Sequence, residues 1–416
     1  PPEEADLLAL YIVPLLEQAY DSLAVRYGYK PPTPIRLEFY RYHADFSVRT
    51  VGLAGLGALG VSFGSLLAMD TPNGREKGQF NWGSTAWHEL THAFTLGASD
   101  HRVPRWLSEG LSVLEERRVG RGWGADATVS YVLAMANGTL RPISQLSDGF
   151  LRPRFPEETQ FSYYAASLFC EMVEASRGAA ALPAMLKGYR DGMDTPGVFQ
   201  KVLGTTPRQI DAEFEAYTQR KFALALAAVR GATPNDSSGG KFVATMREGV
   251  AKMGSDRNAA RALFEQARAM FPEYGGEDGP SWYLAEMARA ANDTTRALTF
   301  VEYVTSRNET AWEANMMEAD LREARGDKTG AIRALDRLNW IWPYDPLVHV
   351  RLATLSAAQG DRARAVLERQ RNTYANQLRS LQLEVSEAYY RLQQNDQLVR
   401  VYDANVRNDL VILRDS

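Results

Sequence analysis

Cysteine and histidine are both scarce in this chain. Its 416 residues include one cysteine, Cys170, and five histidines. A single cysteine excludes an intramolecular disulfide framework and any zinc or iron–sulfur site built from several thiolates. A metal site in such a chain must therefore be assembled from a few histidines together with carboxylates.

A strong charge of one sign is also missing. Residues 1–230 hold 23 Lys and Arg against 25 Asp and Glu, and residues 231–416 hold 24 against 26, so each half has a net charge of -2. This balance excludes a basic nucleic-acid-binding arm and an acidic tail. With 45% hydrophobic residues and a mean hydropathy of -0.33, the composition is that of a folded chain rather than a disordered one. We expect the function to reside in a local site, and we expect no nucleic-acid partner.

An uncharged run of membrane-spanning length without glycine is also missing. The longest uncharged stretch, residues 51–69, has the length of a membrane span but contains five glycines. Such glycine-rich runs are typical of buried strands with a close backbone approach, so we expect no membrane span in this chain. The missing initiator methionine and the near-absence of cysteine favour an exported or periplasmic bacterial protein over a cytoplasmic one.

The second half of the chain is periodic. Turn signals end in Asp293, Asp327, Asp361 and Asp396, which are 34, 34 and 35 residues apart, and each precedes a helical segment. A helix–turn–helix unit with this period resembles the tetratricopeptide repeat. The resemblance implies about four and a half units over 241–416, stacked with a concave face on which a protein partner could dock. An unspecialised helical domain is the alternative, and residues 231–240 have the composition of a linker.

The first 230 residues lack a period. Helical spacing covers Leu7–Tyr27, strand-like patterns cover Ile35–Tyr40 and Val61–Met69, and most of Ser84–Arg230 is helical in character. These patterns predict a small α+β domain over residues 1–230 that continues into helices.

One motif in this domain carries chemistry. His88, Glu89 and His92 form an H-E-x-x-H sequence in a stretch with helical character. Residues four apart lie on one face of a helix, so both imidazoles can reach a single cation. Glu89 then lies beside the metal, where its carboxylate can hold a water molecule.

A catalytic zinc site takes three protein ligands and leaves one position open for water. A second helix is predicted after Pro104, and it carries Glu109, which sixteen intervening residues separate from His92. An antiparallel helix pair with a short loop brings Glu109 back level with His92. We therefore expect Glu109 to be the third ligand.

Together the motifs resemble a known family. H-E-x-x-H followed by Trp106-Leu-Ser-Glu109-Gly is similar to the gluzincin metallopeptidases, and most of residues 1–225 resemble the bacterial peptidase MA-like proteins that carry tetratricopeptide repeats. The resemblance implies a zincin-like α+β fold for the first domain. It implies hydrolysis of peptide bonds by metal-activated water. By this resemblance His88, His92 and Glu109 are the ligands of one zinc ion, and Glu89 is the general base.

The resemblance also assigns the oxyanion donor and the substrate strand. In related aminopeptidases a tyrosine on a later helix stabilises the oxyanion, which places Tyr164 in that role with Tyr163 as the fallback. The family's substrate lies along an edge strand beside the metal, which implies contacts with Val61, Ser62, Phe63 and Gly64. No Gly-x-Met-Glu-Asn segment is present to anchor a substrate amino terminus, so the sequence departs from the aminopeptidase branch here and leaves endo- against exopeptidase activity open.

Two other functions stay open at this stage. A chain with this fold could be a catalytically inactive scaffold that binds proteins through its repeats. Gly60-Val-Ser62-Phe-Gly64 also matches the nucleophile elbow of serine hydrolases, although the seven residues between Gly64 and Pro72 leave little room for the helix which that motif requires. His43 and His349 are interpreted as structural, His101 as a surface residue and Cys170 as a small buried side chain.

Overall fold

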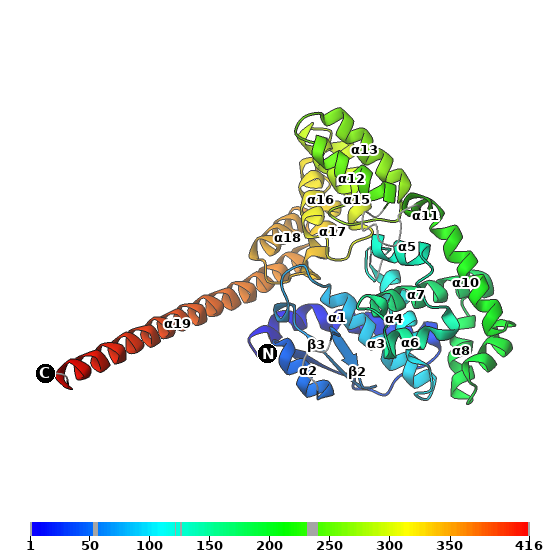
Figure 1. Cartoon of the computed structure of the whole chain (residues 1–416), viewed down its shortest axis with the longest axis horizontal. Helices are drawn as coiled ribbons and strands as arrows, with labels where there is room; N and C mark the ends of the chain where they lie inside the picture. The colour runs from blue at the N-terminus through cyan, green and yellow to red at the C-terminus, as the bar shows by residue number, and fades with distance from the viewer. Residues whose placement is uncertain (1, 53–56, 121, 125–126, 231–239, 415–416) are drawn as a thin grey trace. The chain divides into compact units, whose positions relative to one another are not determined.

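The structure is a computed structural model that describes residues 2–52, 57–120, 122–124, 127–230 and 240–414. It is mostly helical and contains one three-stranded sheet (Figure 1). The described chain divides into two compact units. The first unit runs from Ala9 to Trp342, and the second combines Pro2–Leu8 with 343–416.

The sheet consists of β1 (Arg36–Tyr40), β2 (Gly60–Ser62) and β3 (Leu66–Asp70) in the order β1-β3-β2. β3 pairs in parallel with β1, with Arg36 opposite Leu66, and antiparallel with β2, with Val61 opposite Ala68. The prediction of β1 is confirmed.

The prediction of one strand over Val61–Met69 is wrong, because this segment is a hairpin. Gly64 has φ +78°, and the Phe63 N–H donates to the Leu66 carbonyl at 2.8 Å. Glycine enters this left-handed region without a Cβ penalty, so the chain reverses there. A continuous apolar run carries no sign of that reversal except the glycine itself.

Helices α1 (Pro2–Tyr27) and α2 (His43–Val51) come before the hairpin. The helical prediction for Leu7–Tyr27 is confirmed by α1. Among the described helices α1 is the one whose length and apolar composition would allow it to cross a membrane, a test that buried core helices and signal sequences also pass. Buried apolar side chains recur along its part in the first unit: Tyr11, Ile12, Leu15, Ala19 and Leu23.

The helices α3 (Trp82–Ala98) and α4 (Arg105–Val119) pack together in the first unit, and α3 also packs against β2 and β3. The side chain of Asn81 caps α3 by accepting the Ser84 N–H at 3.0 Å. Gly110 lets α4 approach α7 (Glu158–Arg177) closely, because a Cβ there would lie 2.6 Å from the Ala166 carbonyl oxygen. This approach explains the glycine that follows Glu109.

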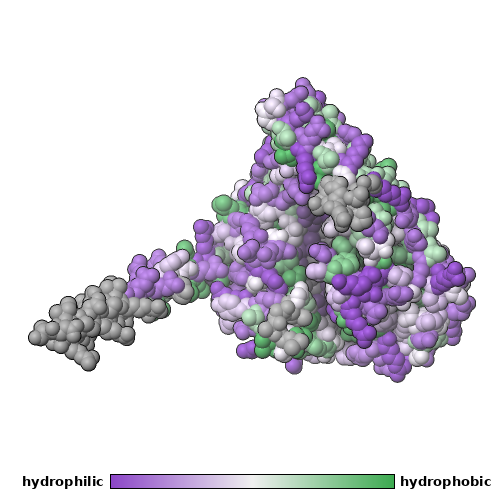
Figure 2. Space-filling view, in the orientation of Figure 1, coloured by the Kyte–Doolittle hydropathy of each residue, from purple (hydrophilic) through white to green (hydrophobic). Residues whose placement is uncertain are grey.

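Further helices complete the first half of the chain around this pair. They are α5 (Val129–Ala136), α6 (Leu146–Leu151), α8 (Ala181–Arg190), α9 (Thr195–Val198), α10 (Pro207–Lys221) and α11 (Ala223–Val229), with the short 3₁₀ segments η1 (Pro72–Gly74) and η2 (Ile143–Gln145) and the π-helical segment η3 (Phe199–Leu203). The face shown in Figure 2 is largely hydrophilic, with apolar residues in small patches.

Paired helices form the rest of the first unit. We call them the helix-pair segment: α12 (Gly240–Lys252) with α13 (Arg257–Met270), α14 (Pro280–Ala290) with α15 (Thr294–Thr305), and α16 (Trp312–Ala324) with α17 (Lys328–Asn339). Asp256, Asp293 and Asp327 each cap the second helix of a pair through the N–H three residues on. These three aspartates are therefore helix caps. The predicted linker lies almost wholly outside the described residues, and the boundary it implied stays a prediction.

The second unit contains α18 (Pro346–Ala358) and α19 (Arg362–Arg414). Asp361 precedes α19 as expected and accepts the Arg364 N–H at 2.9 Å. The turn predicted at Asn395-Asp396 is wrong, because α19 continues through it. The earlier turns contain a residue with positive φ, such as Gly326 or Gly360, and no such residue interrupts the described part of α19.

Candidate metal centre

Two histidines and one glutamate converge between α3 and α4. His88 and His92 lie one turn apart on α3, and the Nε2 atom of each is 3.1 Å from Oε2 of Glu109 on α4. One ligand atom from each residue lies within 4.8 Å of the other two. The structure thus brings together the three side chains that the sequence singled out, and this group could hold a metal ion.

The Nδ1 atom of each ring, on the side away from Glu109, contacts a polar side chain of α4. His88 Nδ1 contacts the carboxylate of Glu116, which also accepts the Ser84 hydroxyl at 3.0 Å. His92 Nδ1 lies 2.8 Å from the hydroxyl oxygen of Ser108. Such partners fix the orientation of a ligating imidazole and leave its Nε2 atom for the metal.

Ion pairing holds Glu109 in its place. Its second carboxylate oxygen, Oε1, accepts from Arg105 Nε at 3.0 Å. Burial acts to raise the pKa of Glu109, but His92 and His88 outweigh it and hold that pKa well below its usual value. Burial likewise acts to lower the pKa of His88, yet Glu116 and Glu109 raise it well above the usual value.

Glu89 lies beside this group and is only 4% exposed. Its Oε2 atom has no hydrogen-bond partner among the residues that the structure describes. Burial raises the pKa of Glu89 to about 7, although the two histidines oppose that shift. A buried carboxylate without a matching donor is costly, and such groups are typical of functional sites.

A glycine brings the sheet close to Glu89. A Cβ on Gly60, the first residue of β2, would lie 2.7 Å from Glu89 Cγ. β2 is an edge strand of the sheet and packs against α3. The close approach that the glycine-rich run suggested is therefore made, at Gly60, toward the glutamate of the H-E-x-x-H motif.

The donor set and the charge of the site suit a cation. Three buried carboxylates, those of Glu89, Glu109 and Glu116, surround two imidazoles, and the nearby guanidinium of Arg105 is 48% exposed. Two imidazole nitrogens and a carboxylate oxygen are ligands that divalent transition metals accept. A bound cation would offset the negative charge that the protein itself leaves unmatched.

Of the two candidate tyrosines, Tyr163 is the one beside the histidines. Its ring lies 6.1 Å from that of His88, it hydrogen-bonds with Arg105, and burial raises its pKa. Tyr164 lies in the core and packs edge-on against Tyr131 at 4.8 Å. The structure therefore places the fallback residue, rather than Tyr164, at the site. Adjacent residues on a helix point about 100° apart, so packing decides which one faces the metal ligands.

The proposed substrate strand is shorter than expected. Val61 and Ser62 belong to β2, whereas Phe63 and Gly64 form the turn of the hairpin. Phe63 is 54% exposed. A peptide that adds to this edge could therefore pair along Gly60–Ser62, and not along Phe63 and Gly64. Because Ser62 is followed by β3 and not by a helix, it does not occupy a nucleophile elbow.

Sequence reasoning missed three residues of the site: Arg105, Ser108 and Glu116. The signal for two of them was present, because Arg105 lies four residues before Glu109 and Glu116 lies seven residues after it. Both spacings keep a residue on the same face of α4. Ser112, which the helical spacing also favours, lies farther from His92 Nδ1 than Ser108 does, at 3.4 Å.

The other histidines and the cysteine are engaged elsewhere. His43 contacts Asp70 at 2.9 Å, and His349 is fully buried against Glu368 and the Pro343 carbonyl. His101 is exposed, and Cys170 is buried as a free thiol.

Comparison with protein-family models, curated proteins and solved structures found no match to this chain.

Proposed function

We propose that this protein is a zinc-dependent peptidase of the gluzincin type whose tetratricopeptide-like helix pairs dock a substrate or partner. The observation that carries the proposal is the convergence of His88 and His92 on one oxygen of Glu109, beside Glu89, whose Oε2 has no hydrogen-bond partner among the described residues. Zinc bound by these three ligands would polarise a carbonyl group and lower the pKa of water to near 7.

The side chains around the site have distinct roles in this proposal. Glu89, buried beside the three ligands, accepts a proton from the attacking water and returns it to the leaving amine. Tyr163 donates its hydroxyl hydrogen to the oxyanion, a contribution worth about 3 kcal/mol in comparable sites. The exposed edge of β2 orients the peptide through its backbone, which explains how sequences of different side chains could be accommodated.

The test uses purified protein loaded with zinc and an unbiased peptide library. Wild type should bind one zinc ion per chain and cleave peptides. The Glu89→Gln variant should keep the zinc and lose cleavage by about 10²–10⁴-fold, because only proton transfer is removed. Tyr163→Phe should slow turnover, whereas its neighbour Tyr164→Phe should leave turnover unchanged.

Three results would contradict the proposal. Zinc binding without cleavage by wild type would favour an inactive scaffold that acts through its helix pairs. Cleavage without zinc that depends on Ser62 would favour a serine hydrolase. Full activity of Glu89→Gln would remove the assigned general base.

A further inference from the structure

The N-terminus of α3, the helix that carries both histidines, is held by the helix-pair segment. The Trp82 N–H donates to the Trp340 carbonyl at 3.0 Å, and Trp82 Nε1 donates to the Asn339 carbonyl at 2.9 Å. The first N–H groups of a helix have no partner within that helix. A turn more than 250 residues away in sequence therefore satisfies one of these donors in α3.

Packing reinforces these hydrogen bonds. The rings of Trp82 and Trp340 lie 5.1 Å apart, and Trp123 packs edge-on against Trp340 at 6.0 Å. A Cβ on Gly83 would lie 2.4 Å from Trp340 Cε3, so only glycine fits between α3 and this indole. The indole of Trp340 thus sets the position of the first turn of α3.

A second loop contacts the same end of α3. In residues 306–311, the Glu309 carbonyl accepts from Asn81, the capping residue of α3, at 3.4 Å, and the Glu309 carboxylate accepts the Gly124 N–H at 3.0 Å. The Lys77 ammonium lies 3.4 Å from the centre of the Trp312 ring at the start of α16.

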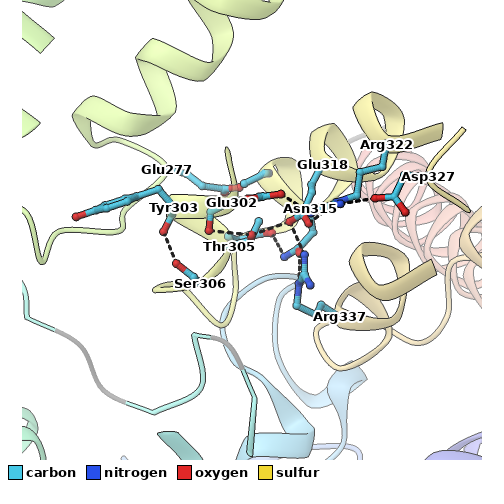
Figure 3. A network of polar contacts seen from close by, with 12 residues as sticks. Glu277, Glu302, Tyr303, Thr305, Ser306, Asn315, Glu318, Arg322, Asp327 and Arg337 are labelled. Atoms are coloured by element: carbon cyan, nitrogen blue, oxygen red, sulfur yellow. Dashed lines mark hydrogen bonds and ion pairs between the residues drawn. The ribbon is translucent and has the colours of Figure 1, made fainter. Parts of the chain in front are cut away.

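One buried glutamate links the bases of these two loops (Figure 3). Thr305, at the end of α15, donates to Glu318 Oε2 at 2.7 Å, and Arg337, near the end of α17, donates to the same oxygen. Arg337 also donates to Asn315 at 2.6 Å. The loop that holds Asn81 and the turn that holds Trp82 are therefore fastened to a single carboxylate.

A short series of contacts leads from the Trp340 turn to a metal ligand. Ser84 follows Gly83 in the first turn of α3, and its hydroxyl donates to Glu116, which in turn contacts His88 Nδ1. A shift of this turn would move the group that orients His88. Outer partners of this kind change metal affinity by about 10–100-fold when they are removed.

We propose that Trp340 is a positioning residue for the metal centre: the turn after α17 fixes the first turn of α3 and, through Ser84 and Glu116, the geometry of His88. This inference rests on the metal site of the proposed function and does not require peptidase activity.

The test measures Co²⁺ binding and its visible absorption spectrum, which reports ligand geometry, in the full chain. Trp340→Ala should weaken Co²⁺ affinity about tenfold and shift the absorption bands, whereas Trp340→Phe should retain most of the affinity. Gly83→Ala should weaken binding in the wild-type background. It should do so much less in the Trp340→Ala background, where the closest of the contacts that remain for the added methyl group is Trp123 Cη2 at 3.1 Å. Phe264→Ala removes a buried ring of the same segment that packs on Gly249 and Tyr283, and it should leave the spectrum unchanged.

The outcomes separate this inference from the proposed activity. Wild-type affinity and spectrum in both Trp340→Ala and Gly83→Ala would overturn the inference. An equal loss in Phe264→Ala would also overturn it, because the effect would then be general loosening. A wild-type chain that binds no Co²⁺ would overturn the metal site and this inference together, whereas Co²⁺ binding without peptide cleavage would contradict only the peptidase.

Discussion

Buried carboxylates have different partners in two regions of this molecule. In the helix-pair segment, Glu318 is buried and faces two guanidinium groups, those of Arg322 and Arg337. In the metal centre, Glu89, Glu109 and Glu116 are buried around two imidazoles, and one oxygen of Glu89 has no partner among the described residues. A carboxylate paired inside the protein holds the fold together, whereas an unmatched group of carboxylates is suited to a cation supplied from outside.

Removing the charge of Glu318, which is paired with arginines, should have the largest effect on stability. Glu318→Gln leaves Arg337 and Arg322 without their buried partner, so we expect the free energy of unfolding to fall by about 3 kcal/mol. Urea unfolding of the metal-free protein measures it. The control Glu265→Gln affects an exposed pair, 3.8 Å from Arg296, and should change stability by less than about 1 kcal/mol. Equal effects of the two variants would show that the Glu318 network does not stabilise the fold.

Ionisation of the buried Glu89 carboxyl should make the metal-free protein less stable as the pH rises. The pKa of Glu89 is about 7 in the metal-free fold against an ordinary 4.5, so between these values the folded chain keeps a proton that the unfolded chain has released. The free energy of unfolding should therefore fall by up to about 3 kcal/mol as the pH rises from 4.5 to 7. Glu89→Gln removes this loss, so the difference in free energy of unfolding between the variant and wild type should shift in favour of the variant from pH 5 to pH 8. Urea unfolding with a chelator present measures it.

A second glutamate gives the control for that experiment. Burial acts to raise the pKa of Glu171, but Arg117 and Lys221 outweigh it and hold that pKa at about 2. Because the folded-state pKa is lowered, the stabilising contribution of Glu171 is complete above about 4.5 and is lost only as the pH falls toward 2. Glu171→Gln should therefore lower stability by the same amount at pH 5 and at pH 8. Parallel pH profiles for wild type and Glu89→Gln would contradict the assignment of Glu89 as an unmatched charge.

The sequence predicted local features better than distant ones. His88, His92 and Glu109 were identified because helical spacing and one short loop determine how they meet. The hairpin was missed because its reversal depends on Gly64 inside a continuous apolar run. Tyr163 and Tyr164 were not distinguished, since only the packing of α7 decides which of them faces the histidines. The contact between Trp340 and Gly83 has no local signal, because it joins residues more than 250 positions apart.

The smallest effect tests whether the two regions differ in what their carboxylates bind. Glu116, like Glu318, is a buried glutamate with a hydroxyl donor, Ser84, but its other partner is the imidazole of His88 and not an arginine. Glu116→Gln keeps the shape of the side chain and can still hydrogen-bond with Ser84, so we expect little loss of stability and a 10–100-fold weaker affinity for zinc, measured by competition with a chelator. The same substitution at Glu318 should lower stability more than it lowers zinc affinity. Unchanged zinc affinity in Glu116→Gln, with lowered stability, would place Glu116 among the structural carboxylates and leave the metal centre with only its three ligands and Glu89.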